Sequence, residues 1–285
     1  MRLDDERESG NVEDRRGGGF GGLPIGGRHI GIGTIAIALA AWYFGVDPSV
    51  VLNMASGPAQ STQVQSAPAP ADDPMARFVG KVLAETEDTW QPIFQSEGKQ
   101  YVEPKLVLYS GSTPTACGAG EAAMGPFYCP GDQKVYIDLS FYQELKDRFH
   151  APGDFAEAYV IAHEIGHHVQ NLLGITARVD RQRQRLSKAE ANRLSVKVEL
   201  QADCLAGVWA ANADKTRHIL EQGDIEEAIA AATAIGDDRL QQQSRGYAVP
   251  DSFTHGSSEQ RVRWFTRGME GGKPGVCNTF TAASL

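Results

Sequence analysis

Positive charge, cysteine and long apolar runs are all scarce in this sequence. Its 285 residues carry 27 Lys and Arg against 36 Asp and Glu, a formal net charge of -9. Because a surface that binds nucleic acid is basic, nucleic acid is not the expected partner. The four cysteines form no C-x-x-C pair, which argues against a cysteine zinc site. The 41% of hydrophobic and 22% of charged residues are the composition of an ordinary globular protein.

One long apolar run lies near the N-terminus. Residues 30–46 read IGIGTIAIALAAWYFGV, seventeen residues without a charge, with Trp42 and Tyr43 near one end. This length and the aromatic pair predict a membrane-spanning helix over residues 29–46. A buried core helix is the alternative. The polar flanks on both sides argue against it because they offer such a helix no packing partner.

The flanks of this run predict a topology. Residues 1–28 are charged and then Gly-rich, which predicts a disordered tail, and residues 47–74, rich in Ala, Pro and Ser, predict a tether. Five arginines precede the run, and the next basic residue is Arg77. The positive-inside rule therefore predicts a cytoplasmic N-terminus, one membrane crossing and an extracytoplasmic domain over residues 75–285. A cleaved signal peptide is the competing interpretation, and the long, partly acidic leader disfavours it.

An exported domain would place the cysteines in an oxidising compartment. Cys117 and Cys129 flank a Gly- and Pro-containing loop, and a disulfide between them would brace a segment with little regular structure. Cys204 and Cys277 are then paired as the remainder. Four cysteines allow three connectivities, and buried free thiols stay open as an alternative.

The rest of the chain alternates helical and extended patterns. Apolar periodicity and capping signals predict helices over residues 75–95, 141–149, 154–174 and about 188–212, with two more that begin near 224 and after 257. Capping boxes are predicted at Asp154 with Glu157, at Ser187 with Glu190, at Asp224 with Glu227 and at Ser257 with Gln260. Short β-rich runs predict strands over 105–109 and 134–139. The predicted fold class is α+β, dominated by helices with a small sheet.

The helix predicted over 154–174 carries an H-E-x-x-H motif. His163 and His167 are four residues apart, so both imidazoles lie on one helix face and can reach the same metal ion. Glu164 follows the first histidine and can approach a water molecule bound to that metal. The motif predicts a zinc hydrolase.

A zinc ion held by two histidines needs a third protein ligand and an open position. The best candidate is Glu199, in the middle of the next predicted helix, with Asp203 one turn further on. Asp203 could accept a hydrogen bond from the outer nitrogen of a ligating histidine. An exposed acidic pair is the alternative, but the apolar flanks of both residues predict a buried helix, in which carboxylates need partners.

These residues resemble a known family. An H-E-x-x-H motif followed by E-x-x-x-D on a second helix looks like the gluzincin group of zinc metallopeptidases. More narrowly, residues 17–265 resemble a bacterial family of neutral zinc metallopeptidases, on the Gly-rich tail and single anchor and on FYCPGDQKVYIDLSF, APGDFAEAYVIAHEIGHHVQNLLG, VELQADCLAGVW and HGSSEQRVRWF. The resemblance implies a zincin-like fold, zinc on His163, His167 and Glu199, and Glu164 as the base. In a bacterium, the topology predicted above corresponds to the inner membrane, with the domain over residues 75–285 on its extracytoplasmic side.

The predicted chemistry is zinc-assisted hydrolysis of peptide bonds in a protein or peptide substrate, with Glu164 as general base. His255 is the preferred candidate for oxyanion stabilisation, with Tyr247 as the second candidate. A purely structural role for His255, just before the start of a predicted helix, is the alternative. His168 points about 100° away from the motif face and is interpreted as a residue that either packs in the core or supports a ligand. Arg261 and Arg263 are candidates for pairing with acidic groups near the site, although no spacing rule connects them with it. The strand at 135–139 is where an extended substrate would pair, by analogy with zincin-like architecture.

Two other functions stay open. The same site could serve an amidase that acts on a cell-wall peptide. The domain could also be a membrane-tethered scaffold that keeps zinc for stability. Glu164 argues against the scaffold, because a structural zinc ion has no use for a general base and prefers four protein ligands. The sequence predicts neither the natural substrate nor the oligomeric state.

Overall fold

The computed structural model describes residues 1–16 and 72–285. The predicted membrane segment, 29–46, and nearly all of the predicted tether, 47–74, lie outside these residues. Within the described part, no helix has the length and apolar character to cross a membrane.

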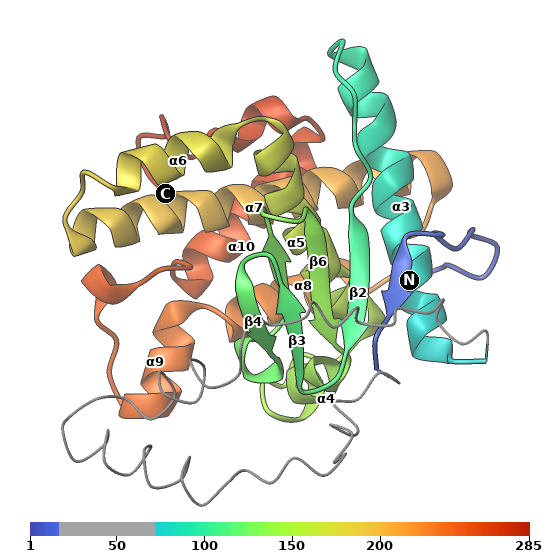
Figure 1. Cartoon of the computed structure of the whole chain (residues 1–285), viewed down its shortest axis with the longest axis horizontal. Coiled ribbons are helices and arrows are strands. Elements are labelled where there is room, and N and C mark those ends of the chain that lie inside the picture. Colours follow the sequence, from blue (N-terminus) through green and yellow to red (C-terminus); the bar gives the residue numbers. More distant parts are fainter. Residues whose placement is uncertain (17–71) are drawn as a thin grey trace, which may run out of the picture. The chain divides into compact units, whose positions relative to one another are not determined.

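Eight α-helices and six strands make up the described chain (Figure 1). The helices are α3 (Pro74–Ser96), α4 (Ser140–Asp147), α5 (Asp154–Leu172), α6 (Ile175–Arg183), α7 (Lys188–Arg217), α8 (Asp224–Ala234), α9 (Asp237–Arg245) and α10 (Ser258–Gly271). The strands are β1 (Val12–Asp14), β2 (Lys105–Tyr109), β3 (Ser112–Thr115), β4 (Gly118–Glu121), β5 (Phe127–Cys129) and β6 (Lys134–Asp138). The predicted α+β class with a small sheet is confirmed.

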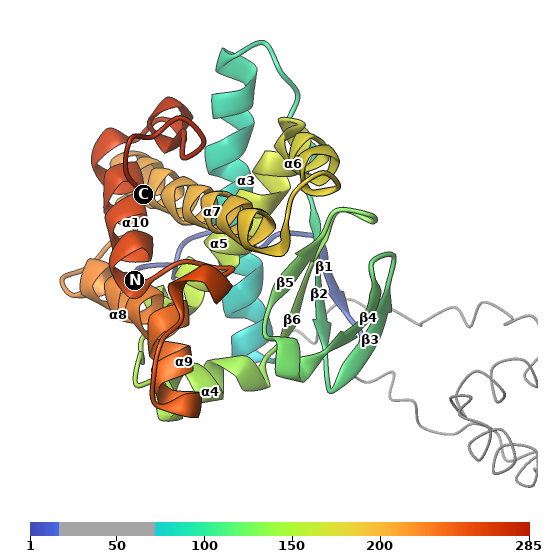
Figure 2. The same ribbon diagram turned by 90° about the vertical axis from the view of Figure 1, so that its left-hand side faces the viewer.

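Four strands form the main sheet in the order β1-β2-β6-β5, with β5 antiparallel to its neighbour and the others parallel. The helices cover one face of this sheet, and the β3–β4 hairpin lies toward the other (Figure 2). Side chains alternate between the two faces. Leu106 and Leu108 join the large core under the helices, whereas Val107 and Tyr109 join a small cluster on the opposite face.

The strand at 135–139, predicted to pair with a substrate, lies inside the sheet. It forms β6, which is hydrogen-bonded to β2 on one side and β5 on the other. The edge toward β2 is paired along the whole of β6, and β5 pairs with residues 134–136 on the other edge. The prediction is therefore wrong for the first half of the strand. Register and neighbours depend on long-range pairing, which the apolar pattern of a single strand does not reveal.

The N-terminal segment is ordered where the sequence predicts disorder. Residues 12–14 form β1 alongside β2 and belong to the same compact unit as residues 72–285. The carboxylate of buried Glu87, on α3, accepts hydrogen bonds from Ser9 at 2.5 Å, Arg7 at 2.8 Å and Asn11 at 2.9 Å. The charged residues that suggested a tail are thus partners of charges on α3. A three-residue strand leaves no periodic signal, so composition alone gave the wrong result for residues 1–16.

Two of the four predicted capping boxes are confirmed, at the starts of α7 and α10. The box predicted at Asp224 does not form, because α8 begins at Asp224 itself, directly after Gly223. The box predicted for α5 does not form, because the helix begins at Asp154 itself. Glu227, on α8, replaces it and accepts a hydrogen bond from the Phe155 amide at 3.0 Å. Gly153 makes room for this carboxylate, since a Cβ there would lie 2.0 Å from the Glu227 carboxyl carbon. A glutamate distant in sequence therefore caps the helix that carries the motif.

Glu157 gives stability a pH dependence at this helix end. Burial, reinforced by the charges of Asp154 and Glu227, raises the pKa of Glu157 to about 7. The ionised form therefore destabilises the fold above pH 7, and this cost disappears as the pH falls toward the unfolded pKa of about 4.3. We expect Glu157→Gln to raise the free energy of unfolding by about 1–2 kcal/mol at pH 8, allowing for solvent screening, and to leave it unchanged near pH 4. Urea titrations at the two pH values test this, and an equal gain at both would contradict it.

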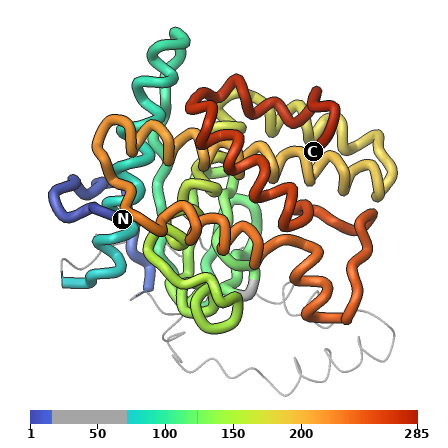
Figure 3. The backbone as a smooth tube through the Cα atoms, turned by 180° about the vertical axis from the view of Figure 1, so that it is seen from behind, coloured from blue at the N-terminus to red at the C-terminus, as the bar shows by residue number. Residues whose placement is uncertain are grey.

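Both predicted disulfides, Cys117–Cys129 and Cys204–Cys277, are present, with Cα atoms 5.8 and 5.5 Å apart. The second links α7 to the C-terminal segment, which follows α10 and returns along α7 (Figure 3).

Candidate metal centre

Helix α5 crosses α7 closely enough to bring side chains of both helices together. Gly166, inside the H-E-x-x-H motif, faces α7, where a Cβ would lie 2.9 Å from the Ala202 carbonyl oxygen. On its other side α7 packs against α10, where a Cβ on Gly268 would lie 1.9 Å from the Cys204 carbonyl oxygen. Glycines at both contacts allow backbones to approach without steric conflict. The close crossings place one turn of α7 between α5 and α10.

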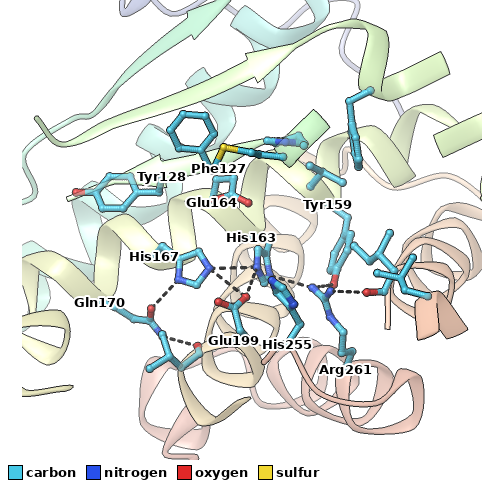
Figure 4. A pocket seen from close by; sticks show the side chains of 18 of the residues that line it. Phe127, Tyr128, Tyr159, His163, Glu164, His167, Gln170, Glu199, His255 and Arg261 are labelled. Atoms are coloured by element: carbon cyan, nitrogen blue, oxygen red, sulfur yellow. Dashed lines mark hydrogen bonds and ion pairs between the residues drawn. The ribbon is translucent and has the colours of Figure 1, made fainter. Parts of the chain in front are cut away.

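The three predicted metal ligands meet at the first crossing (Figure 4). His163 Nε2 lies 3.2 Å from His167 Nε2 and 3.2 Å from Glu199 Oε2, and His167 Nε2 lies 3.4 Å from the same oxygen. A tetrahedral zinc ion with bonds of about 2.0–2.1 Å has its ligand atoms about 3.3–3.4 Å apart. These spacings fit three corners of such a tetrahedron, and, among the described residues, the cluster supplies none for the fourth corner.

The outer nitrogens of the histidines have acceptors that orient both rings. His163 Nδ1 lies 2.8 Å from Asp203 Oδ1, and His167 Nδ1 lies 2.9 Å from Gln170 Oε1. Each Nδ1 therefore carries a proton, and each Nε2, which faces Glu199, is the ring atom that can bind a cation or a second proton. Two lone pairs and a carboxylate oxygen within 3.4 Å repel one another unless a cation or a proton lies between them. The donor set is that of a divalent metal site.

Asp203 has the supporting position expected of it, in a fully buried charge network. Arg261, on α10, donates to both of its oxygens, at 2.9 and 2.8 Å, and Tyr159, on α5, donates to Oδ1. Despite its burial, Asp203 has a pKa held well below its usual range, because Arg261 and His163 are beside it. Asp203 in turn raises the pKa of His163 to about 10, against the effect of burial. Asp203 therefore stays charged and keeps a fixed hydrogen-bond acceptor toward His163.

Glu164 lies on the wall of a cavity of about 930 Å³ that also exposes His163, His167 and Glu199. Its side chain is buried, and burial raises the pKa of its carboxyl above the ordinary value, partly offset by the two histidines. Apolar side chains such as Phe127 share the wall. The volume is at the upper end of the range for ligand pockets.

His255 faces the same cavity, as its predicted role requires, whereas Tyr247 does not. Asp237, at the start of α9, holds the His255 loop through hydrogen bonds from the amides of Thr254, His255 and Gly256 and lies 3.2 Å from His255 Nδ1. This hydrogen bond to Asp237 raises the pKa of His255. Tyr247 is 59% exposed and lies beside Arg245. The second candidate for oxyanion stabilisation is therefore not brought to the site.

His168 is a buried structural residue, as predicted. Its Nε2 lies 2.6 Å from the Val102 carbonyl oxygen and its Nδ1 lies 3.0 Å from the Tyr128 hydroxyl, whose ring lines the cavity. Burial lowers the pKa of His168 to about 4. His168 therefore stays neutral and fixes a wall residue.

Three supporting residues, Tyr159, Gln170 and Asp237, were not predicted from the sequence, and Arg261 was named only as a candidate partner of acidic groups near the site. Tyr159 and Gln170 lie four residues before His163 and three after His167, so helical spacing could have placed both on the motif face. Arg261 and Asp237 come from α10 and α9, and no spacing rule connects either of them with the motif. The helix that begins with Asp237 was itself not predicted.

Comparisons with known proteins identify a family for this chain. The family described as "Putative neutral zinc metallopeptidase" matches residues 1–280. The chain is 53% identical over 287 residues to "Uncharacterized protein YpfJ" of Escherichia coli strain K12, a match that covers 98% of this chain and 99% of that protein. It is 44% identical over 206 residues to "Uncharacterized protein Rv2575" of Mycobacterium tuberculosis strain H37Rv, covering 69% of this chain and 67% of the relative. No solved structure matches the chain. Because the family match extends over residues 1–280, this protein belongs to the family of neutral zinc metallopeptidases.

Proposed function

We propose that this protein is a zinc-dependent peptidase whose single zinc ion is held by His163, His167 and Glu199. The observation that carries the proposal is the triangle of 3.2, 3.2 and 3.4 Å among their donor atoms, which opens onto a cavity. A structural zinc ion is normally enclosed by four protein ligands, whereas three ligands and an open position are typical of catalysis.

The residues around the three metal ligands have separate roles in the proposed hydrolysis. A zinc ion held by His163, His167 and Glu199 would supply Lewis acidity, which would lower the pKa of a water molecule and polarise the scissile carbonyl. Glu164 accepts the proton of that water molecule and passes it to the leaving amine. Burial favours this role because it raises the pKa of Glu164 and so strengthens the carboxylate as a base. His255 donates a hydrogen bond to the developing oxyanion.

A peptide is the substrate class that suits the cavity wall. Phe127 and Tyr128 of β5 line the cavity, and β5 is the outermost strand on that side of the described sheet. The backbone of an outermost strand can pair with an extended peptide by strand addition. We therefore move the proposed substrate edge from β6 to β5.

Replacing His255 tests the oxyanion assignment. We expect His255→Ala to lower kcat by about 10²–10³-fold, because a hydrogen bond made only in the transition state is lost. The zinc content should stay the same, since His255 is not among the three ligands. Tyr247→Phe is the control and should leave kcat unchanged. A fall in zinc content, or an equal effect of both substitutions, would contradict the assignment.

The proposal as a whole is tested by metal content together with hydrolysis. Purified full-length chain should contain one zinc ion and cleave members of a panel of envelope proteins, and chelation should stop the cleavage. The panel should also contain cell-wall peptides, because an amidase would hydrolyse only these. A protein that binds zinc and cleaves neither class would be a scaffold.

We also propose that the peptidase domain acts outside the cytoplasm, at the bacterial inner membrane. Its two disulfides support this location, because disulfides persist in oxidising compartments. The anchor at 29–46 stays a prediction from the sequence. The pairing of β1 with β2 requires residues 1–16 and 72–285 to lie on the same side of the membrane. A single crossing at 29–46 would place them on opposite sides. The pairing and a single crossing therefore exclude each other.

Cysteine labelling tests this condition. All four native cysteines are in disulfides, so single added cysteines at Asp5 and Gln95, both exposed, can be labelled selectively on intact cells with an impermeant maleimide. Because β1 is paired, we expect both positions to react. Reaction at Gln95 alone would show a single crossing with β1 unpaired, and reaction at neither would contradict the extracytoplasmic location.

A further inference from the structure

Two buried glutamines connect His167 to the C-terminal segment. Gln170 Oε1 lies 2.9 Å from His167 Nδ1, and Gln170 Nε2 donates to the Val198 carbonyl oxygen at 2.7 Å and to Gln201 Oε1 at 3.1 Å. Gln201 Nε2 donates in turn to the Cys277 carbonyl oxygen at 2.8 Å. Gln170 is 1% exposed and Gln201 is 7% exposed, so water does not replace these partners.

The carbonyl groups of Val198 and Cys277 decide which group donates and which accepts in every hydrogen bond of this series. A carbonyl oxygen only accepts, so the side-chain nitrogens of Gln170 and Gln201 must face Val198 and Cys277. The oxygen of Gln170 is then turned toward His167, whose Nδ1 has to donate. The lone pair of His167 is thereby placed on Nε2, the atom that faces Glu199. Turning the Gln170 amide over would break both of its buried donor bonds.

The Cys277 end of this hydrogen-bond series is attached to α7, the helix that supplies Glu199. Cys277 is disulfide-bonded to Cys204 on α7, and Thr279 donates to the Lys197 carbonyl oxygen of the same helix at 2.6 Å. Val198 and Gln201 also belong to α7, on either side of Glu199. The hydrogen bonds of Gln170 and Gln201 therefore fix the position of the His167 ring, on α5, relative to the Glu199 carboxylate on α7.

We infer that Gln170 is a positioning residue: it holds His167 in the tautomer and ring orientation that bind the metal, and Gln201 and the Cys277 carbonyl hold Gln170. The inference rests on the proposed zinc site. It assigns His167 a neutral amide partner where His163 has the charged Asp203. A neutral partner leaves the site with a single buried carboxylate behind the histidines, and Arg261 neutralises that one.

Zinc affinity and apo-protein stability, measured separately, test the inference. Dissociation constants of the full chain come from competition with a fluorescent zinc chelator, and Tm of the metal-free protein comes from thermal unfolding. Gln170→Met removes the acceptor and the donor, and we expect zinc to bind about 10–100-fold more weakly. Gln170→Glu keeps the acceptor for His167 and loses the donor to Val198. It should lower Tm but keep zinc affinity within about threefold of wild type.

Two further variants separate positioning from general stability. Thr279→Val removes a bond between the same C-terminal segment and α7 outside the hydrogen-bond series, so it should lower Tm and leave zinc affinity unchanged. Gln201→Met should weaken zinc binding by less than Gln170→Met, because Val198 still holds Gln170. Zinc affinity that falls in step with Tm in all four variants would overturn the inference, as would wild-type affinity in Gln170→Met. A wild-type chain that does not bind zinc would overturn the proposed function, and this inference with it.

Discussion

Glu164→Gln is expected to abolish hydrolysis while the chain keeps its zinc ion. Glutamine has the shape of glutamate and cannot accept a proton, so kcat should fall by about 10²–10⁴-fold, the usual contribution of a general base. Metal content should stay at one zinc ion per chain because the three ligands are untouched. The free energy of unfolding should not decrease, since the substitution removes a buried charge. Hydrolysis rates and metal analysis on the same preparation measure both effects.

Glu157→Gln is the matched control for this experiment. It makes the same substitution on the same helix, at a position outside the cavity wall. Its kcat should equal that of wild type at neutral pH. Glu164→Gln with a kcat within about tenfold of wild type would remove the proposed mechanism. Loss of zinc in that variant would instead make Glu164 part of the binding site.

Arg261→Met is expected to have the largest effect on stability. Asp203 is fully buried, and Arg261 makes two hydrogen bonds to it, so removing the guanidinium leaves an unpaired charge in the core. Breaking such a pair from one side costs about 3–5 kcal/mol, which corresponds to a fall in Tm on the order of 10 °C for a domain of this size. Zinc binding should also weaken, since Asp203 orients His163. Denaturant and thermal unfolding of the metal-free protein measure the loss.

Two variants show whether the charge is the cause. Arg263→Met, two residues along α10, removes an exposed arginine that pairs with Glu259, and should cost at most about 1 kcal/mol. The double variant Asp203→Asn with Arg261→Met removes both buried charges and should recover part of the stability, although not the zinc affinity. If the double variant were as unstable as the sum of the single ones, the two residues would act independently and the proposed network would be wrong.

Much of the site was predictable because its residues lie within a few positions of one another on two helices. His163 and His167 share a helix face through their four-residue spacing, and Glu199 and Asp203 do so on a second helix whose apolar flanks indicated burial. The capping boxes at Ser187 and Ser257 are likewise contained in four consecutive residues. The cysteine pairing was also correct. It was predicted because Cys117 and Cys129 are close in sequence, which left Cys204 and Cys277 as the second pair.

The errors have a common physical origin in contacts between distant segments. The box predicted at Asp154 failed because Glu227, far along the chain, caps the helix instead. The strand at 135–139 was identified, but its place inside the sheet depends on its neighbours β2 and β5. Residues 1–16 looked like a tail because their partners, Glu87 among them, lie on α3.

The sequence by itself therefore determined the metal-binding chemistry: two histidines, two carboxylates and their helices, because hydrogen bonding and side-chain direction within a helix depend on near neighbours. The tertiary structure alone decided which atoms of those side chains face each other. Asp203 is charged because Arg261 reaches it from α10, and His167 presents Nε2 because carbonyl groups of α7 and the C-terminal segment orient Gln170. These partners carry no spacing signal, since packing of separate elements brings them together only in the folded chain.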